Sequence, residues 1–266
     1  MQRVKGQARV ALAAGARGAC LTGLRQAGAA KVFLPRVHAP DPEVVFLNTA
    51  GGLTGGDLLE WALELGPNAR AVATTQTAER IYTSSTGVAR ARMRVQVGAG
   101  GAVDWLPQET ILYEGSALER NTRIDLAAGA ELLYAETLVL GRAAMGETVA
   151  QCHLNDRREI WRDGVPLVID AVRLRPGALL PGQGALLGDA RAVASVIWVA
   201  PGVEDQIATV RRYLAETCGD VRAAASAWDG KCVIRLAAHD GWPLRKALAA
   251  VLTRLRAAPL PRVWQI

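Results

Sequence analysis

The sequence predicts a mainly β (α+β) fold of stacked, layered β-sheets, made of repeated hairpin units with two amphipathic helices near the C-terminus. Three observations support this prediction. A turn phrase recurs in the first half of the chain, strand-like segments alternate apolar and polar residues, and helical spacing of apolar residues begins only after residue 200. Because no low-complexity linker separates these patterns, we expect one domain over residues 1–266.

The recurrent phrase is a hydrophobic residue followed by a Gly or Asn turn and then a β-prone run. Its copies lie at 10–16, 65–69, 97–102 and 126–130. The last three copies are about thirty residues apart, as in repeated supersecondary units. They are followed by the segments Thr74–Glu79, Trp105–Thr110 and Tyr134–Thr137. Each unit is interpreted as a β-hairpin with a returning strand.

One segment shows the strand period clearly. Arg90, Arg92 and Arg94 alternate with Ala91 and Met93, which places charge on one face of a strand and apolar groups on the other. The arginine row therefore predicts a solvated sheet face. A nucleic-acid surface would also need aromatic side chains for base stacking, and aromatic residues are only 5% of the chain.

Two helices are predicted in the last quarter of the chain. The first covers about 203–216, where Val203, Ile207, Val210 and Leu214 share one face and acidic residues occupy the first turn. The second covers about 243–256, because Pro243 suits a first helical turn and an Ala-Pro pair ends the pattern at Pro259.

Composition excludes several classes of protein. Half of the 266 residues are hydrophobic, which excludes a disordered chain, and no apolar run reaches the roughly 18 residues of a membrane span. The four cysteines are scattered and form no CxxC pair, so neither a disulfide framework nor a structural zinc site is indicated. They are interpreted as reduced thiols of a cytoplasmic protein with no membrane association.

The net charge of +6 is unevenly distributed. Residues 1–40 contain seven Lys or Arg side chains and no Asp or Glu. Such an electropositive end could attract a nucleic acid or an acidic protein. We expect a protein partner and no nucleic acid, since the chain is poor in aromatic residues.

A glycine-rich segment at 48–57, Asn-Thr-Ala-Gly-Gly-Leu-Thr-Gly-Gly-Asp, is the most unusual part of the chain. Four glycines in six positions allow the backbone to approach another group closely. Neither GxGxxG nor a P-loop motif is present, so nucleotide binding is disfavoured. We expect a tight structural turn that positions Thr54 and Asp57.

Three glutamates, Glu79, Glu109 and Glu136, fall at similar places in successive repeats. In a stacked β structure, equivalent positions of neighbouring repeats lie in register, so these carboxylates would form a ladder. A buried ladder requires cations, hydrogen bonds or water. Two interpretations stay open: a polar path that conducts or binds cations, or glutamates that each bond a backbone turn.

The chain closely resembles one family, urease accessory protein D, called H in some bacteria. The similarity covers nearly the whole chain, and the segments that carry it are FLNTAGGLTGGD at 46–57, TTQTAERIY at 74–82, LPQETIL at 106–112, LGRAAMGE at 140–147 and PRVW at 261–264. Several motifs of this length are jointly specific.

The resemblance implies a non-enzymatic maturation factor, a chaperone or scaffold for GTP-dependent insertion of nickel into the urease apoprotein. Its implied partners are that apoprotein, a helical adaptor accessory protein and a nickel-binding GTPase accessory protein. It also implies an internal passage for Ni²⁺, with no permanently bound cofactor. The candidate path residues by motif match are Asp57, Thr75, Glu79, Glu109, Glu136 and Glu147. Thr54 is a further candidate site residue, positioned by the glycine-rich turn.

An enzyme is the alternative prediction. In this interpretation Glu109 and Glu136 are the paired carboxylates of a hydrolase with a β-rich body. Glycosidases hold such pairs about 5 to 9.5 Å apart. The scarcity of aromatic residues argues against a sugar site.

Overall fold

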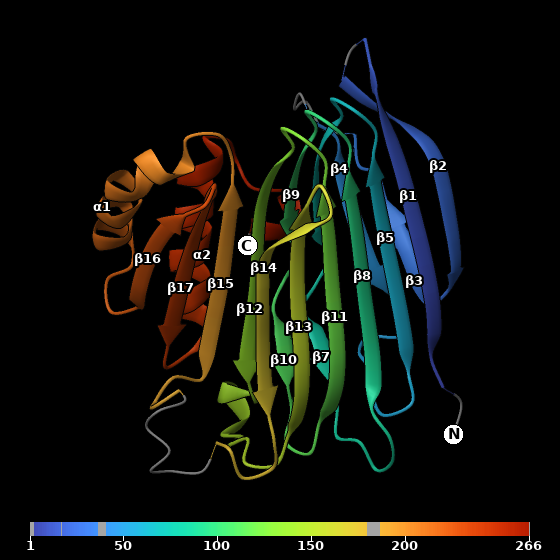
Figure 1. Cartoon of the computed structure of the whole chain (residues 1–266). Helices are drawn as coiled ribbons and strands as arrows, with labels where there is room; N and C mark the ends of the chain where they lie inside the picture. Colours follow the sequence, from blue (N-terminus) through green and yellow to red (C-terminus); the bar gives the residue numbers. More distant parts are fainter. Residues whose placement is uncertain (1–2, 17, 37–40, 180–186, 266) are drawn as a thin grey trace.

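The computed structural model describes residues 3–16, 18–36, 41–179 and 187–265. It contains two stacked β-sheets, with helices against one end of the second sheet (Figure 1). Sheet A has the strand order β14-β13-β11-β8-β5-β1-β2. Its strands are β1 (Lys5–Gly15), β2 (Gly18–Gly28), β5 (Leu58–Leu65), β8 (Ala89–Val97), β11 (Ala117–Leu126), β13 (His153–Arg162) and β14 (Val165–Leu174).

Sheet B has the order β16-β17-β15-β12-β9-β6-β4-β3, and the short strands β7 and β10 pair beside β12. Its strands are β3 (Ala30–Phe33), β4 (Glu43–Asn48), β6 (Arg70–Thr75), β7 (Glu79–Ile81), β9 (Ala102–Leu106), β10 (Thr110–Leu112), β12 (Glu131–Leu140), β15 (Ala192–Val199), β16 (Arg222–Trp228) and β17 (Lys231–Ala238). The predicted class, a mainly β protein of stacked layers, is confirmed.

The repeat unit is a coil that crosses from one sheet to the other. Strands β5, β8 and β11 lie in sheet A, and the strand after each of them lies in sheet B. Successive coils pair in parallel, so that Leu59, Ala91 and Arg120 form one row across sheet A. The predicted hairpin unit is therefore wrong for these repeats, because parallel neighbours need a crossover where a hairpin gives antiparallel strands.

The recurrent phrase forms the stacked turns between the sheets. Asn68, Gly100 and Gly129 have φ of 57°, 65° and 67° at equivalent places in successive turns. Asn68 N–H donates to the carbonyl of Ala99 at 2.9 Å, and Gly100 N–H donates to that of Ala128 at 3.0 Å. Asn and Gly recur because they tolerate this left-handed conformation.

The first copy of the phrase has a different role. It lies in β1, which forms an antiparallel hairpin with β2 and pairs in parallel with β5. Here the hairpin prediction is confirmed.

Both predicted helices are present. Helix α1 (Ile207–Thr217) continues from the 3-10 turn η2 (Val203–Gln206), and α2 (Gly241–Arg256) begins after Asp240, whose side chain accepts the Trp242 N–H. The helices cover the β15-β17-β16 end of sheet B (Figure 1). None of the helices in the described part of the chain has the length and apolar character needed to cross a membrane.

Apolar residues form two cores. One lies between sheets A and B and includes Phe46, Leu63 and Ile124, and the other lies between sheet B and the helices. The terminal 3-10 turn η3 (Arg262–Trp264) joins the second core, where the Trp264 indole N–H donates to the carbonyl of Leu106 at 3.0 Å. A further 3-10 turn, η1 (Ala143–Met145), follows β12.

The arginine row on β8 lies on the outer face of sheet A, as predicted. Arg90 pairs with Glu119 at 3.0 Å and Arg92 pairs with Glu60 at 2.9 Å, and all four side chains are at least 32% exposed. Ion pairs this exposed are worth little in stability. The row is a solvated face whose charges are largely matched by carboxylates on neighbouring strands.

The glycine-rich turn packs against the chain after β7. A Cβ added at Gly52 would lie 2.7 Å from the Arg80 carbonyl oxygen, and one added at Gly55 would lie 2.2 Å from that of Thr86. The carboxylate of Asp57 accepts the backbone N–H groups of Val4 and Thr54, both at 2.8 Å. The predicted tight structural turn is confirmed, and glycine is needed for the close approach.

We expect Gly55→Ala to lower the free energy of unfolding by about 1–3 kcal/mol, because the new methyl group overlaps fixed backbone. Gly66→Ala is the control, since its Cβ would meet no atom closer than 3.5 Å. Urea unfolding of both variants measures the difference. Equal midpoints for the two variants would contradict the close approach of Gly55 to the Thr86 carbonyl.

Candidate functional site

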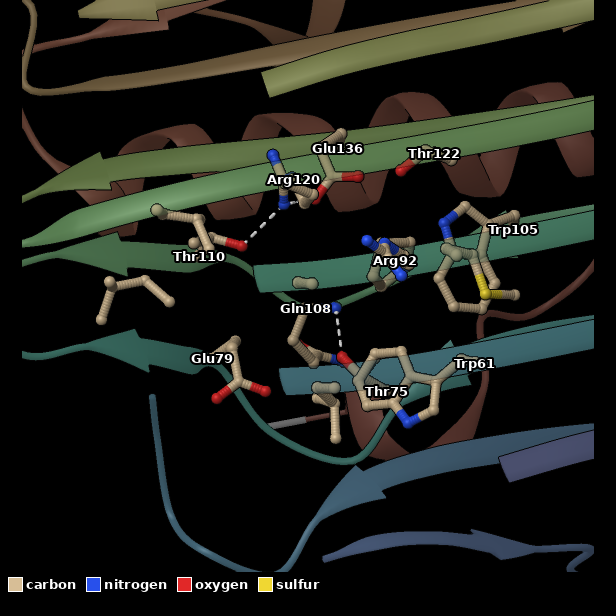
Figure 2. Close-up of a pocket in the computed structure, with 16 residues that line it drawn as sticks. Trp61, Thr75, Glu79, Arg92, Trp105, Gln108, Thr110, Arg120, Thr122 and Glu136 are labelled. Carbon is tan, nitrogen blue, oxygen red and sulfur yellow. Dashed lines mark hydrogen bonds and ion pairs between the residues drawn. The ribbon is translucent and has the colours of Figure 1, made fainter. Parts of the chain in front are cut away.

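A cavity of about 50 Å³ lies between the two sheets and contains charged groups (Figure 2). A cavity of this volume has room for about three or four water molecules. Its walls include Trp61 of β5 and Arg120 of β11 from sheet A, and Glu79 of β7, Trp105 of β9 and Glu136 of β12 from sheet B. Two predicted path carboxylates, Glu79 and Glu136, therefore line one cavity.

Two tryptophans, Trp61 and Trp105, line the cavity. Both indoles pack on Phe46. The ring centroid of Trp61 lies 5.6 Å from that of Phe46, and the centroid of Trp105 lies 5.8 Å from it. Their buried Nε1–H groups have no hydrogen-bond partner in the protein. Buried donors are nearly always satisfied, so these two are exceptions among the described residues.

Glu79 lies on the opposite side of Gln108 from Glu136 (Figure 2). Its Oε1 accepts the side-chain N–H of Asn48 at 3.1 Å, and Asn48 also donates to the Gly52 carbonyl at 3.2 Å. Burial raises the pKa of Glu79 to about 7, because the Asn48 bond and the charge of Arg80 only partly offset desolvation. Near neutral pH this carboxyl group can therefore both hold and release a proton.

Glu136 is held in a buried ion network. Arg120 bonds both carboxylate oxygens of Asp156, at 2.9 and 2.7 Å, and its Nη1 donates to Thr110 Oγ1 at 2.9 Å and to Glu136 Oε1. The hydroxyl of Tyr134 donates to the other Glu136 oxygen at 2.9 Å. The side chains of Arg120, Glu136 and Asp156 are 10%, 4% and 0% exposed.

The two carboxylates of this network differ in electrostatics. Burial raises the pKa of both, but the adjacent Arg120 and Arg158 outweigh it at Asp156 and hold that pKa below its usual value. At Glu136 burial and the nearby Asp156 charge outweigh Arg120, so that the pKa is raised. Asp156 is therefore more readily ionised than Glu136.

The network continues to the edge strand of sheet A. Arg158 lies 3.5 Å from Asp156 and 3.6 Å from Asp170 of β14, and Asp170 pairs with Arg235 of β17 at 2.9 Å. The sequence motifs did not single out five residues of this network: Arg120, Tyr134, Asp156, Arg158 and Asp170. A signal was present: Arg120 lies between Leu118 and Thr122, and Asp156 between Leu154 and Arg158, at positions where the alternation places inward side chains.

The predicted ladder of three glutamates is wrong. Glu79 pairs in register with Thr110, and Thr110 pairs with Leu138, so Glu109 is one residue out of phase with both other glutamates. Since side chains alternate between faces, Glu109 points away from the cavity. It lies against α2, where its Oε2 accepts from Arg245 Nη1 at 2.9 Å.

The remaining candidate residues bond to backbone or to surface groups. Thr75 lines the cavity and its Oγ1 accepts the Gln108 N–H at 2.9 Å. The Thr54 hydroxyl donates to the Thr83 carbonyl at 2.9 Å, close to the Asp57 turn. Glu147 accepts from the Arg142 side chain at 2.9 Å, and this bond is the main reason that its pKa falls to about 2. The structure brings Thr75, Glu79 and Glu136 together and leaves Thr54, Asp57, Glu109 and Glu147 outside the cavity.

The arrangement does not support the alternative hydrolase. Glu109 and Glu136 point to opposite faces of neighbouring strands, and each is paired with an arginine, so they do not form a carboxyl pair across one cleft. Among the described residues, no group of three or more His, Cys, Asp or Glu side chains could hold a metal ion. The four cysteines are free thiols, and burial raises the pKa of Cys152 and Cys232 to about 11.

Comparison with known proteins gives a consistent result. A family model described as "UreD urease accessory protein" matches residues 4–265. Proteins named "Urease accessory protein UreD" from Cereibacter sphaeroides and Dinoroseobacter shibae are 53% and 51% identical to this chain, covering all of it and 96% and 94% of their own lengths. One of the same name from Rhizobium leguminosarum is 45% identical over 91% of the chain and 88% of its own length.

We expect Glu79→Gln to change how stability depends on pH. A carboxyl group whose pKa is about 7 when folded and near 4.5 when unfolded binds more protons in the folded state, so stability falls as pH rises from about 5 to 8. The glutamine variant lacks this loss, which at full burial amounts to at most about 3 kcal/mol. Urea unfolding at pH 5 and pH 8 tests this, and parallel pH profiles for the two proteins would contradict it.

We also expect Asp156→Asn to destabilise the protein by about 3–5 kcal/mol, because Arg120 and Arg158 would keep buried charge without their shared anion. Glu119→Gln removes a carboxylate from the exposed pair with Arg90 and is expected to cost less than about 1 kcal/mol. Chemical unfolding of both variants measures the contrast. Similar losses would show that the inner network is no more important than the outer one.

Proposed function

This chain belongs to the UreD urease accessory protein family, and we propose that it is a non-enzymatic chaperone that assists GTP-dependent insertion of nickel into the urease apoprotein. Membership places it in urease maturation. In the proposal its partners are the urease apoprotein, a helical adaptor accessory protein and a nickel-binding GTPase accessory protein. GTP hydrolysis belongs to the last of these, and the complex acts in the cytoplasm.

We further propose that Ni²⁺ passes through the interior of the chain at the cavity between sheets A and B. The observation that carries this proposal is the pair of largely buried carboxyl groups, Glu79 and Glu136, on the wall of one cavity. Nickel binds imidazole, thiolate and carboxylate ligands, and the cavity wall contains carboxylates but no histidine or cysteine. Such a site suits brief contact and onward transfer of a cation.

Glu79 supports this route by its protonation. With a pKa of about 7 it can lose its proton as a divalent cation approaches and regain one when the cation leaves. The hydrogen bond from Asn48 fixes the position of the carboxyl group, and Asn48 is itself bonded to the glycine-rich turn. The turn thus contributes to transfer by positioning Glu79.

The proposed route leaves Asp57, Glu109 and Glu147 outside. Asp57 closes the glycine-rich turn, Glu109 anchors α2 through Arg245, and Glu147 bonds the backbone of its own loop. We assign these three a structural role, and only Thr75, Glu79 and Glu136 a place along the path.

The test is activation of urease apoprotein by the purified accessory proteins with GTP, Ni²⁺ and bicarbonate. We expect Glu79→Gln and Glu136→Gln to reduce activation severalfold, because each removes an oxygen anion from the cavity, while complex formation in gel filtration is retained. Glu60→Gln on the outer face of sheet A is the matched control and should activate normally. Equal activation without this chain would refute the chaperone role, and full activation by both cavity variants would refute the route.

A further inference from the structure

One positive charge is already present in the cavity. The Arg120 guanidinium lies on its wall beside Glu136 and is bonded there through Nη1 to both Glu136 and Thr110 (Figure 2). Tyr134 bonds the second oxygen of Glu136. Both carboxylate oxygens of Glu136 therefore already accept a hydrogen bond, and a cation that binds this residue competes with these donors.

The network is also balanced in charge. Within the part of the chain that the structure describes, three guanidinium groups, Arg120, Arg158 and Arg235, are joined to three carboxylates, Glu136, Asp156 and Asp170. A divalent cation added to it would be repelled by Arg120 at close range in a poorly screened interior. The arginine thus competes directly with any cation for Glu136.

The bonds of Arg120 are unequal. Asp156 holds it through two hydrogen bonds, from Nε and Nη2, and Arg158 lies beside the same carboxylate. Glu136 is contacted by Nη1 alone. Because bidentate pairs are the stronger ones, the bond from Arg120 to Glu136 can break while the two bonds from Arg120 to Asp156 remain.

We propose that Arg120 is a tethered internal competitor that keeps the affinity of Glu136 for divalent cations low, so that a cation entering the cavity is passed on and not retained. This inference rests on the proposed function and names the group that regulates its site. A divalent cation at Glu136 displaces Nη1, and the guanidinium, still held by Asp156, returns to Glu136 and expels the cation.

The proposal is tested by equilibrium dialysis of Ni²⁺ against the purified full-length chain near pH 7.5. We expect Arg120→Gln to bind about one Ni²⁺ with at least about tenfold higher affinity than the unmodified protein, because Glu136 loses its guanidinium partner while Asp156 keeps only Arg158. The double variant Arg120→Gln/Glu136→Gln should lose that gain. Arg90→Gln removes the same charge from the outer face and should bind as the unmodified protein does.

Arg120→Lys keeps the proposal testable where the glutamine variant fails to fold. Its ammonium group keeps the charge but cannot bond Asp156 bidentately and reach Glu136 at once, so Ni²⁺ affinity should rise by a smaller factor. If a folded Arg120 variant binds Ni²⁺ no more tightly than the unmodified protein, the competitor role is wrong. That result leaves the route itself standing, since the route is refuted only by full urease activation with the Glu79 and Glu136 variants.

Discussion

The bonds of Arg120 connect the two sheets through a buried network of charged groups. The guanidinium comes from β11 of sheet A, and its partners lie on β13 of the same sheet and on β10 and β12 across the interior. A buried guanidinium is tolerated only where anions and acceptors surround it. Arg120 therefore needs Asp156, Glu136 and Thr110, and the two buried carboxylates in turn need Arg120. The position of Glu136 on the cavity wall and its pKa both depend on this arrangement.

The coiled path of the chain determines which carboxylates can meet. Successive coils pair in parallel, and their turns stack through Asn68, Gly100 and Gly129. Within this regular frame a one-residue offset places Glu79 and Glu136 inside and Glu109 outside against Arg245. The repeat length could be predicted from the turns. Whether each glutamate faces inward or outward depends on the number of residues between its turn and its strand, and the similarity of the motifs does not reveal that number.

Residues of one type act differently on the two faces of sheet A. Arg90 and Arg92 pair with carboxylates in solvent, where screening makes such pairs nearly neutral in energy. Arg120 and Arg158 lie on the inner face of strands in the same sheet, where their charges are buried and demand partners. The alternation that predicted the outer face correctly also placed Arg120 and Asp156 inside, and a charged residue at an inward position was the signal for the network.

The sequence by itself determined the mainly β class, the repeat turns, both helices near the C-terminus and the glycine-rich turn at Asp57. Through its motifs it also determined the family. Each of these depends on local preferences: glycine and asparagine at positive φ, alternation along strands, and helical spacing. Only the tertiary structure decided that the repeats are parallel coils, that Glu79 and Glu136 share a cavity without Glu109, and that Arg120 occupies it. Those outcomes depend on register between strands about thirty residues apart and on the burial that register creates, which no single segment of the chain specifies.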